Sequence, residues 1–138
     1  MTRTYLDTNI LIAAFQGGKD DSYRRIMEVL NEPQRQWVVS DFLALELLPK
    51  PTFYRREEEV AFMQTFLQNA SLHIAASSEV VQKAIYVASS YDVAPMDALH
   101  VAAAWEAQVD EFLTLEKPSH PICRVREIPI RSLFSPME

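Results

Sequence analysis

Four acidic residues, far apart in the chain, stand where a carboxylate could carry chemistry. Asp7 follows the apolar end of a short strand, and Glu46 lies among leucines in FLALELL. Asp97 falls in the first turn of an alanine-rich helix, and Glu116 follows the strand EFLT. Carboxylate oxygens with no Cys or His cluster nearby favour a hard cation such as Mg²⁺ or Mn²⁺. We therefore expect these four acids to form a divalent metal site.

Each of these acids also has a purely structural explanation. Asp7 could cap the helix that follows it, and the dipole of its helix could favour Asp97. Glu46 could face solvent on a half-buried helix, and Glu116 could be an ordinary loop charge. The combination favours the metal site, because clustered carboxylates raise one another's pKa unless a cation relieves the repulsion.

The elements that must position these acids alternate along the chain between short apolar runs and segments with helical spacing. We expect strands over residues 2–7, 37–39, 71–75, 111–114 and 123–128. The expected helices cover residues 8–15, 21–30, 42–48, 52–69, 78–91 and 96–108. This alternation indicates an α/β fold with a central, mainly parallel sheet of four to five strands. The length favours a single domain that spans residues 1–138.

A parallel sheet would bring the acids to one edge. Ligands of such folds collect at the carboxyl ends of the strands. Asp7 lies at such an end, and Glu116 follows another strand. The helix that carries Asp97 starts on the same side of the sheet. Segments that are distant in the sequence can therefore supply ligands to one site.

The composition excludes several other kinds of site. The net charge of −6 argues against a broadly basic nucleic-acid surface, so a polyanionic substrate would need a metal ion at the contact. Cys123 is the single cysteine, which excludes an internal disulfide and fits a reducing, cytosolic compartment. The two adjacent glycines, Gly17 and Gly18, cannot form a glycine-rich phosphate loop. No apolar run approaches the roughly 18 residues of a membrane span, so none is expected.

Four motifs, taken in order, resemble the PIN domain. They are LDTN at Leu6 to Asn9, the acid in LALELL, MDALHVAAA at the start of a helix, and FLTLEK after a late strand. The resemblance spans essentially the whole chain. It implies a three-layer α/β/α fold and a metal-dependent ribonuclease that cuts RNA. It also implies a VapC-like toxin of a type II toxin–antitoxin pair.

The resemblance assigns roles to the acids. Asp7, Glu46 and Asp97 match the three core acidic ligands of the family. The fourth position of the family usually reads Thr or Ser, any residue, then Asp, and here it reads Thr114-Leu115-Glu116. Glu keeps the charge on a longer side chain. Asp110 and Glu111 are nearby alternatives, although they should precede the strand and lie at its far end.

Three polar residues beside the acids are expected to orient carboxylates or water molecules. These residues are Thr8, Asn9 and Thr114. For Thr8 and Asn9, capping of the following helix is an equally good explanation. His100 follows Asp97 by one helical turn, and we interpret it as a hydrogen-bonded residue on the helix face rather than as a ligand.

The expected partners are RNA, a small antitoxin protein and a second copy of the chain. Tyr54, Phe62 and Phe66 exceed what one face of a helix can bury, so they indicate either such a protein surface or ordinary core packing. The departure at Glu116 leaves open a catalytically degenerate module that binds RNA or protein. A phosphotransferase with Asp7 as nucleophile is disfavoured, because Asn9 stands where such enzymes need a second Asp.

Overall fold

The structure is a computed structural model that describes residues 1–136, and its centre is a five-stranded sheet. The strands are β1 Thr2–Leu6, β2 Arg35–Ser40, β3 Leu72–Ile74, β4 Glu111–Thr114 and β5 Ile130–Ser132. They lie in the order β3-β2-β1-β4-β5, and every neighbouring pair is parallel. The expected α/β fold with a parallel sheet is confirmed.

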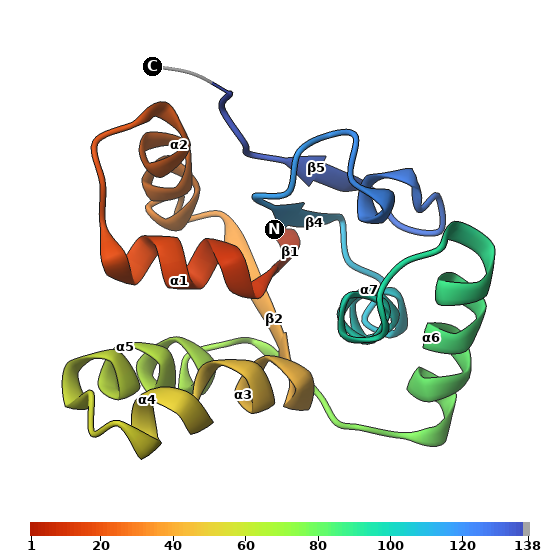
Figure 1. Ribbon diagram of the computed structural model, residues 1–138, viewed down its shortest axis with the longest axis horizontal. Helices are drawn as coiled ribbons and strands as arrows, with labels where there is room; N and C mark the ends of the chain where they lie inside the picture. The colour runs from red at the N-terminus through yellow and green to blue at the C-terminus, as the bar shows by residue number, and fades with distance from the viewer. Residues whose placement is uncertain (137–138) are drawn as a thin grey trace.

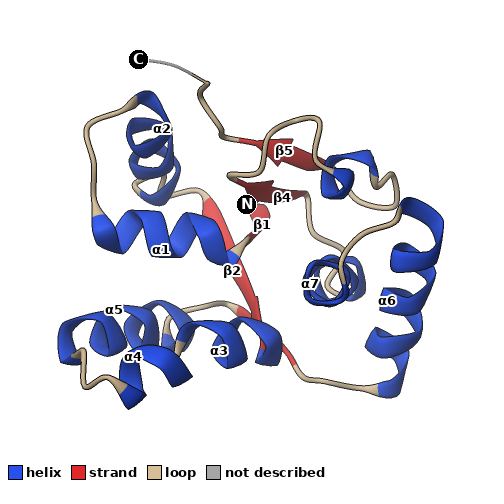
Figure 2. Ribbon diagram, in the orientation of Figure 1, coloured by secondary structure: helices blue, strands red, loops and turns tan. Residues whose placement is uncertain are grey.

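Helices cover both faces of this sheet (Figures 1 and 2). In the order of the chain they are α1 Thr8–Gln16, α2 Asp21–Leu30, α3 Asp41–Leu47, α4 Pro49–Phe53, α5 Glu57–Gln68, α6 Ser78–Tyr91, α7 Pro95–Glu106 and the 3-10 helix η1 Pro121–Arg124. Figure 1 places α1 and α2 on one side of the strands and α6 and α7 on the other. The arrangement is the expected three-layer α/β/α fold.

The strand order reverses at β1. The chain first adds β2 and β3 on one side of β1, and later adds β4 and β5 on the other. The crevice at the carboxyl ends of the strands, where the order reverses, is the usual ligand site of an open parallel sheet. In this chain that crevice lies between the ends of β1 and β4.

The central strand β1 is fixed by burial on both faces. Tyr5 and Leu6 are fully buried, and the Tyr5 ring stacks on Phe112 of β4 with 5.3 Å between the ring centroids. Leu6 pairs in register with Leu113, and the backbone N–H of Asp7 donates to the Leu113 carbonyl at 2.9 Å. The backbone of Asp7 is therefore positioned by the sheet itself.

The alanine-rich helix α7 packs closely in the protein interior. Ala102, Ala103 and Ala104 are all completely buried. Small side chains allow a close approach between elements, and interiors packed to this density leave little room for additional methylene groups. The position of α7, which carries Asp97, is set by this packing.

Two expected elements were wrong in detail. The helix predicted over residues 52–69 is two helices, α4 and α5, and Arg55 between them has a positive φ of 55°. Pro49 opens α4 in the first turn, where its missing N–H costs nothing. The strand predicted over residues 123–128 is instead η1 with an extended segment, because His120 and Pro121 start a helical turn. The fifth strand lies later, at Ile130–Ser132.

Within residues 1–136, no helix is both long enough and apolar enough to cross a bilayer.

We predict that Ala103→Leu destabilises the protein by about 1–3 kcal/mol, because a larger side chain must enter a fully packed interior. The same side chain placed at exposed Gln82 on α6 should change stability by less than about 0.5 kcal/mol. Urea unfolding of both variants measures the difference. Equal effects at the two positions would contradict the close packing of α7.

Candidate active site

Asp7 lies directly after β1 and is the N-cap of α1, with only 3% of its surface exposed. One carboxylate oxygen accepts a hydrogen bond from the Thr8 backbone N–H at 2.8 Å, and the other accepts from the Thr114 hydroxyl at 2.8 Å. Burial raises the pKa of Asp7, the bond from Thr114 offsets part of this rise, and the charge of Glu116 adds to it. The side chain that caps α1 is thus also one of the four acids expected to hold a metal ion.

The hydroxyl of Thr114 holds the end of β4 against Asp7. Besides donating to Asp7, it accepts from the Glu116 backbone N–H at 3.1 Å and from the Asn9 amide at 3.4 Å. The side-chain oxygen of Asn9, Oδ1, in turn accepts a hydrogen bond from the Leu115 backbone N–H at 3.1 Å. Asn9 therefore does not cap α1; it joins the start of α1 to the loop after β4.

Asp97 lies in the first turn of α7, partly buried. Burial raises its pKa, and the negative charge of Asp7 raises it further. Glu116 also contributes to the rise, while His120 and His100 offset part of it. Asp7, Asp97 and Glu116 therefore lie within electrostatic reach of one another.

Glu46 lies near the end of α3, and its side chain is 34% exposed. One of its oxygens lies 2.6 Å from Nε2 of His100. This hydrogen bond is the main reason why the pKa of Glu46 is lowered, and the Thr8 side chain makes a smaller contribution in the same direction. Glu46 is thus bound to α7 through His100 and lies near the start of α1, instead of pointing freely into solvent.

Comparison with known proteins assigns the fold to a family. The family model for the PIN domain matches residues 4–117, a range that contains all four acids. The chain belongs to the PIN domain family. A search of curated protein sequences gave no significant match.

Several solved structures are similar to this PIN domain over nearly its whole length. VapBC2 from Rickettsia felis, bound to a DNA fragment of its promoter, has a TM-score of 0.71 at 17% identity, covering 94% of this chain and 98% of that chain. DNA-bound VapBC from Salmonella typhimurium has a TM-score of 0.70 at 16% identity, with coverages of 96% and 99%. A toxin–antitoxin complex from Klebsiella pneumoniae has a TM-score of 0.67 at 19% identity, with coverages of 95% and 98%.

The buried histidine of this PIN domain was only partly anticipated. The interpretation of His100 as a hydrogen-bonded helix residue is confirmed: Nδ1 lies 2.7 Å from the Tyr5 hydroxyl, and Nε2 lies beside Glu46. Its connection to a site acid was missed. The spacing from Asp97 was the available signal, because residues three apart on a helix share a face.

The alternative acids for the fourth position lie at the opposite end of the sheet. Asp110 accepts from the Arg3 backbone N–H at 2.8 Å, at the amino end of β4. Glu111 forms ion pairs with Arg35 and Arg131. Both acids are therefore occupied by structural contacts away from the crevice.

The segment after β4 forms a wall beside the acids. Burial raises the pKa of the Cys123 thiol, and the charges of Glu116 and Asp7 raise it further, which places η1 next to them. Nε2 of His120 lies 3.8 Å from a Glu116 oxygen. Sequence reasoning missed this wall because it expected a strand from Cys123 onward.

The donor set fits a hard divalent cation. All four side chains are carboxylates, and the pKa values of Asp7 and Asp97 are raised by burial and by neighbouring negative charge. A cation would relieve this strain, and oxygen donors suit Mg²⁺ or Mn²⁺. In residues 1–136, however, no three or more His, Cys, Asp or Glu side chains already stand together as a coordination shell. Within these residues, Asp7, Asp97 and Glu116 therefore influence one another's charge without forming a preformed cage, and Glu46 contacts His100.

We predict that Asp7→Asn stabilises the metal-free protein at neutral pH. The folded-state pKa of Asp7 is raised above its ordinary value of 3.8, so the ionised carboxylate weakens the fold. Below pH 3.8 the group is protonated in both the folded and the unfolded state, and the gain should vanish. As the pH rises toward 7, the unfolding free energy of the wild type should fall relative to that of the variant. Urea titrations with a chelator at several pH values measure this; a gain that does not grow with pH would contradict the strained carboxylate.

Proposed function

We propose that this PIN domain is a metal-dependent ribonuclease and the toxin of a toxin–antitoxin pair. The observation that carries the nuclease proposal is the proximity of Asp7, Asp97 and Glu116 where the strand order reverses: the pKa values of Asp7 and Asp97 are raised by burial and, to a smaller extent, by neighbouring negative charge. We include Glu46 in this set because it binds His100, which follows Asp97 by one turn of α7. The proposed setting for such an enzyme is the cytoplasm.

The roles of the side chains follow from their contacts. Asp7, Glu46, Asp97 and Glu116 would hold the ion. When bound, a divalent ion lowers the pKa of a water molecule and neutralises phosphate charge, which is the chemistry that phosphodiester hydrolysis needs. The hydroxyl of Thr114 keeps the Asp7 carboxylate in a single orientation.

The polar residues at the start of α1 would support this arrangement. The backbone N–H of Thr8 donates to Asp7, and Asn9 secures the loop that carries Glu116. His100 is already occupied by Tyr5 and Glu46, so it does not serve as a general base.

A basic segment beside the acids supports a polyanionic substrate. Residues 117–126 contain Lys117, Arg124 and Arg126, all three exposed, whereas the chain as a whole carries a net charge of −6. An open cavity of about 660 Å³ next to this segment is lined by both arginines, Tyr91 and Cys123. Arginine and lysine contact phosphate groups independently of base sequence, as a backbone-binding surface requires.

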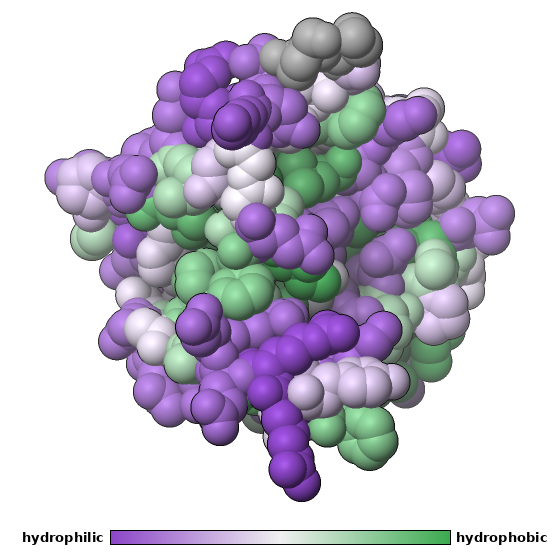
Figure 3. Space-filling model, turned by 60° about the vertical axis from the view of Figure 1, so that its left-hand side comes forward, coloured by the Kyte–Doolittle hydropathy of each residue, from purple (hydrophilic) through white to green (hydrophobic). Residues whose placement is uncertain are grey.

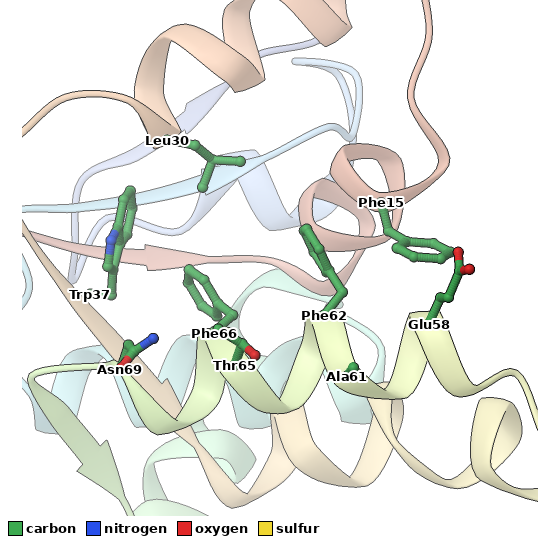
Figure 4. Close-up of a pocket in the computed structure, with 9 residues that line it drawn as sticks. All are labelled: Phe15, Leu30, Trp37, Glu58, Ala61, Phe62, Thr65, Phe66 and Asn69. Carbon is green, nitrogen blue, oxygen red and sulfur yellow. The ribbon is translucent and has the colours of Figure 1, made fainter.

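An apolar groove supports a protein partner. Figure 4 shows Phe15 of α1, Leu30 of α2, Trp37 of β2, and Phe62 and Phe66 of α5 around a cavity of about 680 Å³. Figure 3, with this side of the molecule turned forward, shows apolar surface gathered among polar side chains. An exposed apolar groove of this kind is typical of an interaction site.

The similar solved structures suggest what fills the groove. They include toxin–antitoxin complexes, and we propose that an antitoxin segment occupies this groove. Glu58 lines the groove and neighbours exposed Glu57, so an apolar segment with basic residues at its edge would suit it. Of the aromatic residues expected to mark a partner surface, Phe62 and Phe66 lie in this groove.

Tyr54 lies elsewhere, at the end of α4. It forms an exposed edge-to-face pair with Phe53, with 5.0 Å between the ring centroids, and the two residues are 57% and 78% exposed. We propose this pair as the contact with a second copy of the chain, because exposed aromatic pairs are enriched at interfaces.

We predict that Thr65→Glu abolishes binding to an antitoxin encoded by a small neighbouring reading frame. Thr65 is exposed and lines the groove, so a charge there opposes apolar docking. Gln68→Glu adds the same charge to an exposed position of the same helix and should leave binding unchanged. Co-expression followed by calorimetry compares the two variants. Equal affinities would place the antitoxin elsewhere, and the lack of such a reading frame would remove the toxin assignment but not the nuclease.

We predict that the wild type cleaves single-stranded RNA with Mg²⁺ or Mn²⁺ and stops when a chelator removes the metal. Asp7→Asn should slow cleavage roughly a hundredfold or more, because a neutral amide replaces a charged ligand. Asp110→Asn, the same change at the far end of the sheet, should cleave like the wild type. Gel assays of labelled RNA measure the rates.

Calorimetry with Mn²⁺ separates the two ways in which this prediction can fail. A wild type that binds the metal but cleaves no RNA would overturn the catalytic proposal. A wild type that binds neither Mg²⁺ nor Mn²⁺ at millimolar concentration would favour the degenerate binding module, to which the longer Glu116 points.

A further inference from the structure

A buried row of polar side chains runs from the start of α3 to Glu46 on the same helix. The Ser40 hydroxyl lies 2.6 Å from the Tyr5 hydroxyl, which lies 2.7 Å from Nδ1 of His100. Nε2 of His100 lies 2.6 Å from a Glu46 oxygen. Ser40, Tyr5 and His100 are at most 1% exposed. Three hydrogen bonds thus connect β1, the end of β2, α7 and α3.

The direction of the last hydrogen bond is fixed by chemistry. A glutamate side chain is ionised at neutral pH, and an ionised carboxylate can only accept hydrogen bonds. Nε2 of His100 must therefore carry the proton and donate to Glu46. If Nδ1 lacks a proton, Tyr5 donates to it and accepts from Ser40; if Nδ1 is protonated, those two bonds reverse. In either arrangement the N–H of His100 points at Glu46.

The row is anchored at both ends of α3. Ser40 caps this helix by accepting from the Leu43 backbone N–H at 3.2 Å, and Glu46 lies in the last turn. In the middle, Tyr5 comes two residues before Asp7, and His100 follows Asp97 by one turn. The same hydrogen bonds therefore relate the elements that carry three of the four site acids.

Core stability alone does not account for this row. A buried polar network must satisfy every member, and apolar residues of similar volume often give equal or greater stability. The network is fully satisfied, since no buried side-chain nitrogen or oxygen in the described part of the chain lacks a partner. What the network adds is a fixed hydrogen-bond donor, Nε2 of His100, which binds one oxygen of the Glu46 carboxylate. A donor that fixes a carboxylate in this way is the usual device for orienting a metal ligand.

We propose that His100 is a positioning residue, which, held by Tyr5 and Ser40, orients the Glu46 carboxylate for the divalent ion. This inference rests on the metal site of the proposed function and adds to it the residues that hold one ligand in place. His100 does not contact the ion or the substrate. It acts through the hydrogen bond that Nε2 donates.

Two amide substitutions at one position test this role. In His100→Gln, the longer side chain carries an N–H to the place of Nε2 and can still donate to Glu46. In His100→Asn, the shorter side chain reproduces only the Nδ1 end and leaves Glu46 without its donor. Titration of each metal-free variant with Mn²⁺ by calorimetry should show about 10–100-fold weaker binding for His100→Asn. His100→Gln keeps the donor but loses the contact with Tyr5, so its affinity should fall only severalfold.

Thermal unfolding and the RNA cleavage assay accompany these titrations. A merely structural role for His100 would make the two amides alike in Mn²⁺ affinity, since each replaces a buried ring with a smaller neutral group. Equal Mn²⁺ affinity of His100→Asn and the wild type would overturn the inference while leaving the metal site intact. A wild type that binds no Mn²⁺ would overturn the metal site, and this inference with it.

Tyr5→Phe provides a second test that keeps the ring stacked on Phe112. Loss of the hydroxyl leaves Nδ1 of His100 without its partner, so Mn²⁺ affinity should fall severalfold in this variant. The same change in the His100→Asn background should have no further effect on affinity, because the donor to Glu46 is already missing. If His100→Asn does not fold, Tyr5→Phe alone decides: unchanged Mn²⁺ affinity would overturn the inference.

Discussion

The burial of the Asp7 carboxylate at the end of the central strand is the constraint on which the rest of the site depends. The side chain is 3% exposed, and its position follows from the pairing of β1 with β4. A charge in such a place weakens the fold unless hydrogen bonds or a cation compensate. Thr8 and Thr114 provide the hydrogen bonds, and their contribution offsets the rise in pKa only in part. In the proposed function, a divalent cation would relieve the remaining unfavourable burial of this charge.

The elements around Asp7 are built so that this strain cannot be relieved by movement. Buried alanines hold α7 in the interior, and the Asn9 side chain holds the loop after β4. A helix that could shift would let Asp97 move away from Asp7, and the repulsion between them would disappear. Packing therefore keeps the negative charges of Asp7 and Asp97 close together, which is the arrangement that a cation site would require.

Much of the fold could be predicted from the sequence, because buried strands and helices require recognisable patterns of apolar residues. The run that ends at Leu6 and the strand EFLT were both recognised as buried strands, and their parallel pairing placed Asp7 beside Thr114. The break between α4 and α5 could not be predicted, because the apolar residues keep helical spacing across Arg55. Only the positive φ of Arg55 interrupts the helix. The row from Ser40 to Glu46 was also hidden. Its members come from four elements, and no local pattern shows that a tyrosine on one strand faces a histidine on a distant helix.

In the proposed ribonuclease, the acidic site and its RNA substrate would carry charges of the same sign. An acidic crevice repels RNA, yet the exposed arginines at 124 and 126 stand on the segment that walls the acids. The family match ends at residue 117, so this basic wall lies beyond the part that the chain shares with the family model. In the proposed ribonuclease, chemistry and substrate contact would thus fall to different parts of the chain. The carboxylates of the matched region would hold the ion, and the segment that follows can vary in charge and shape without disturbing them. Differences in which RNA is cut would then arise in that segment, because phosphate contacts position a nucleic acid relative to a fixed catalytic centre.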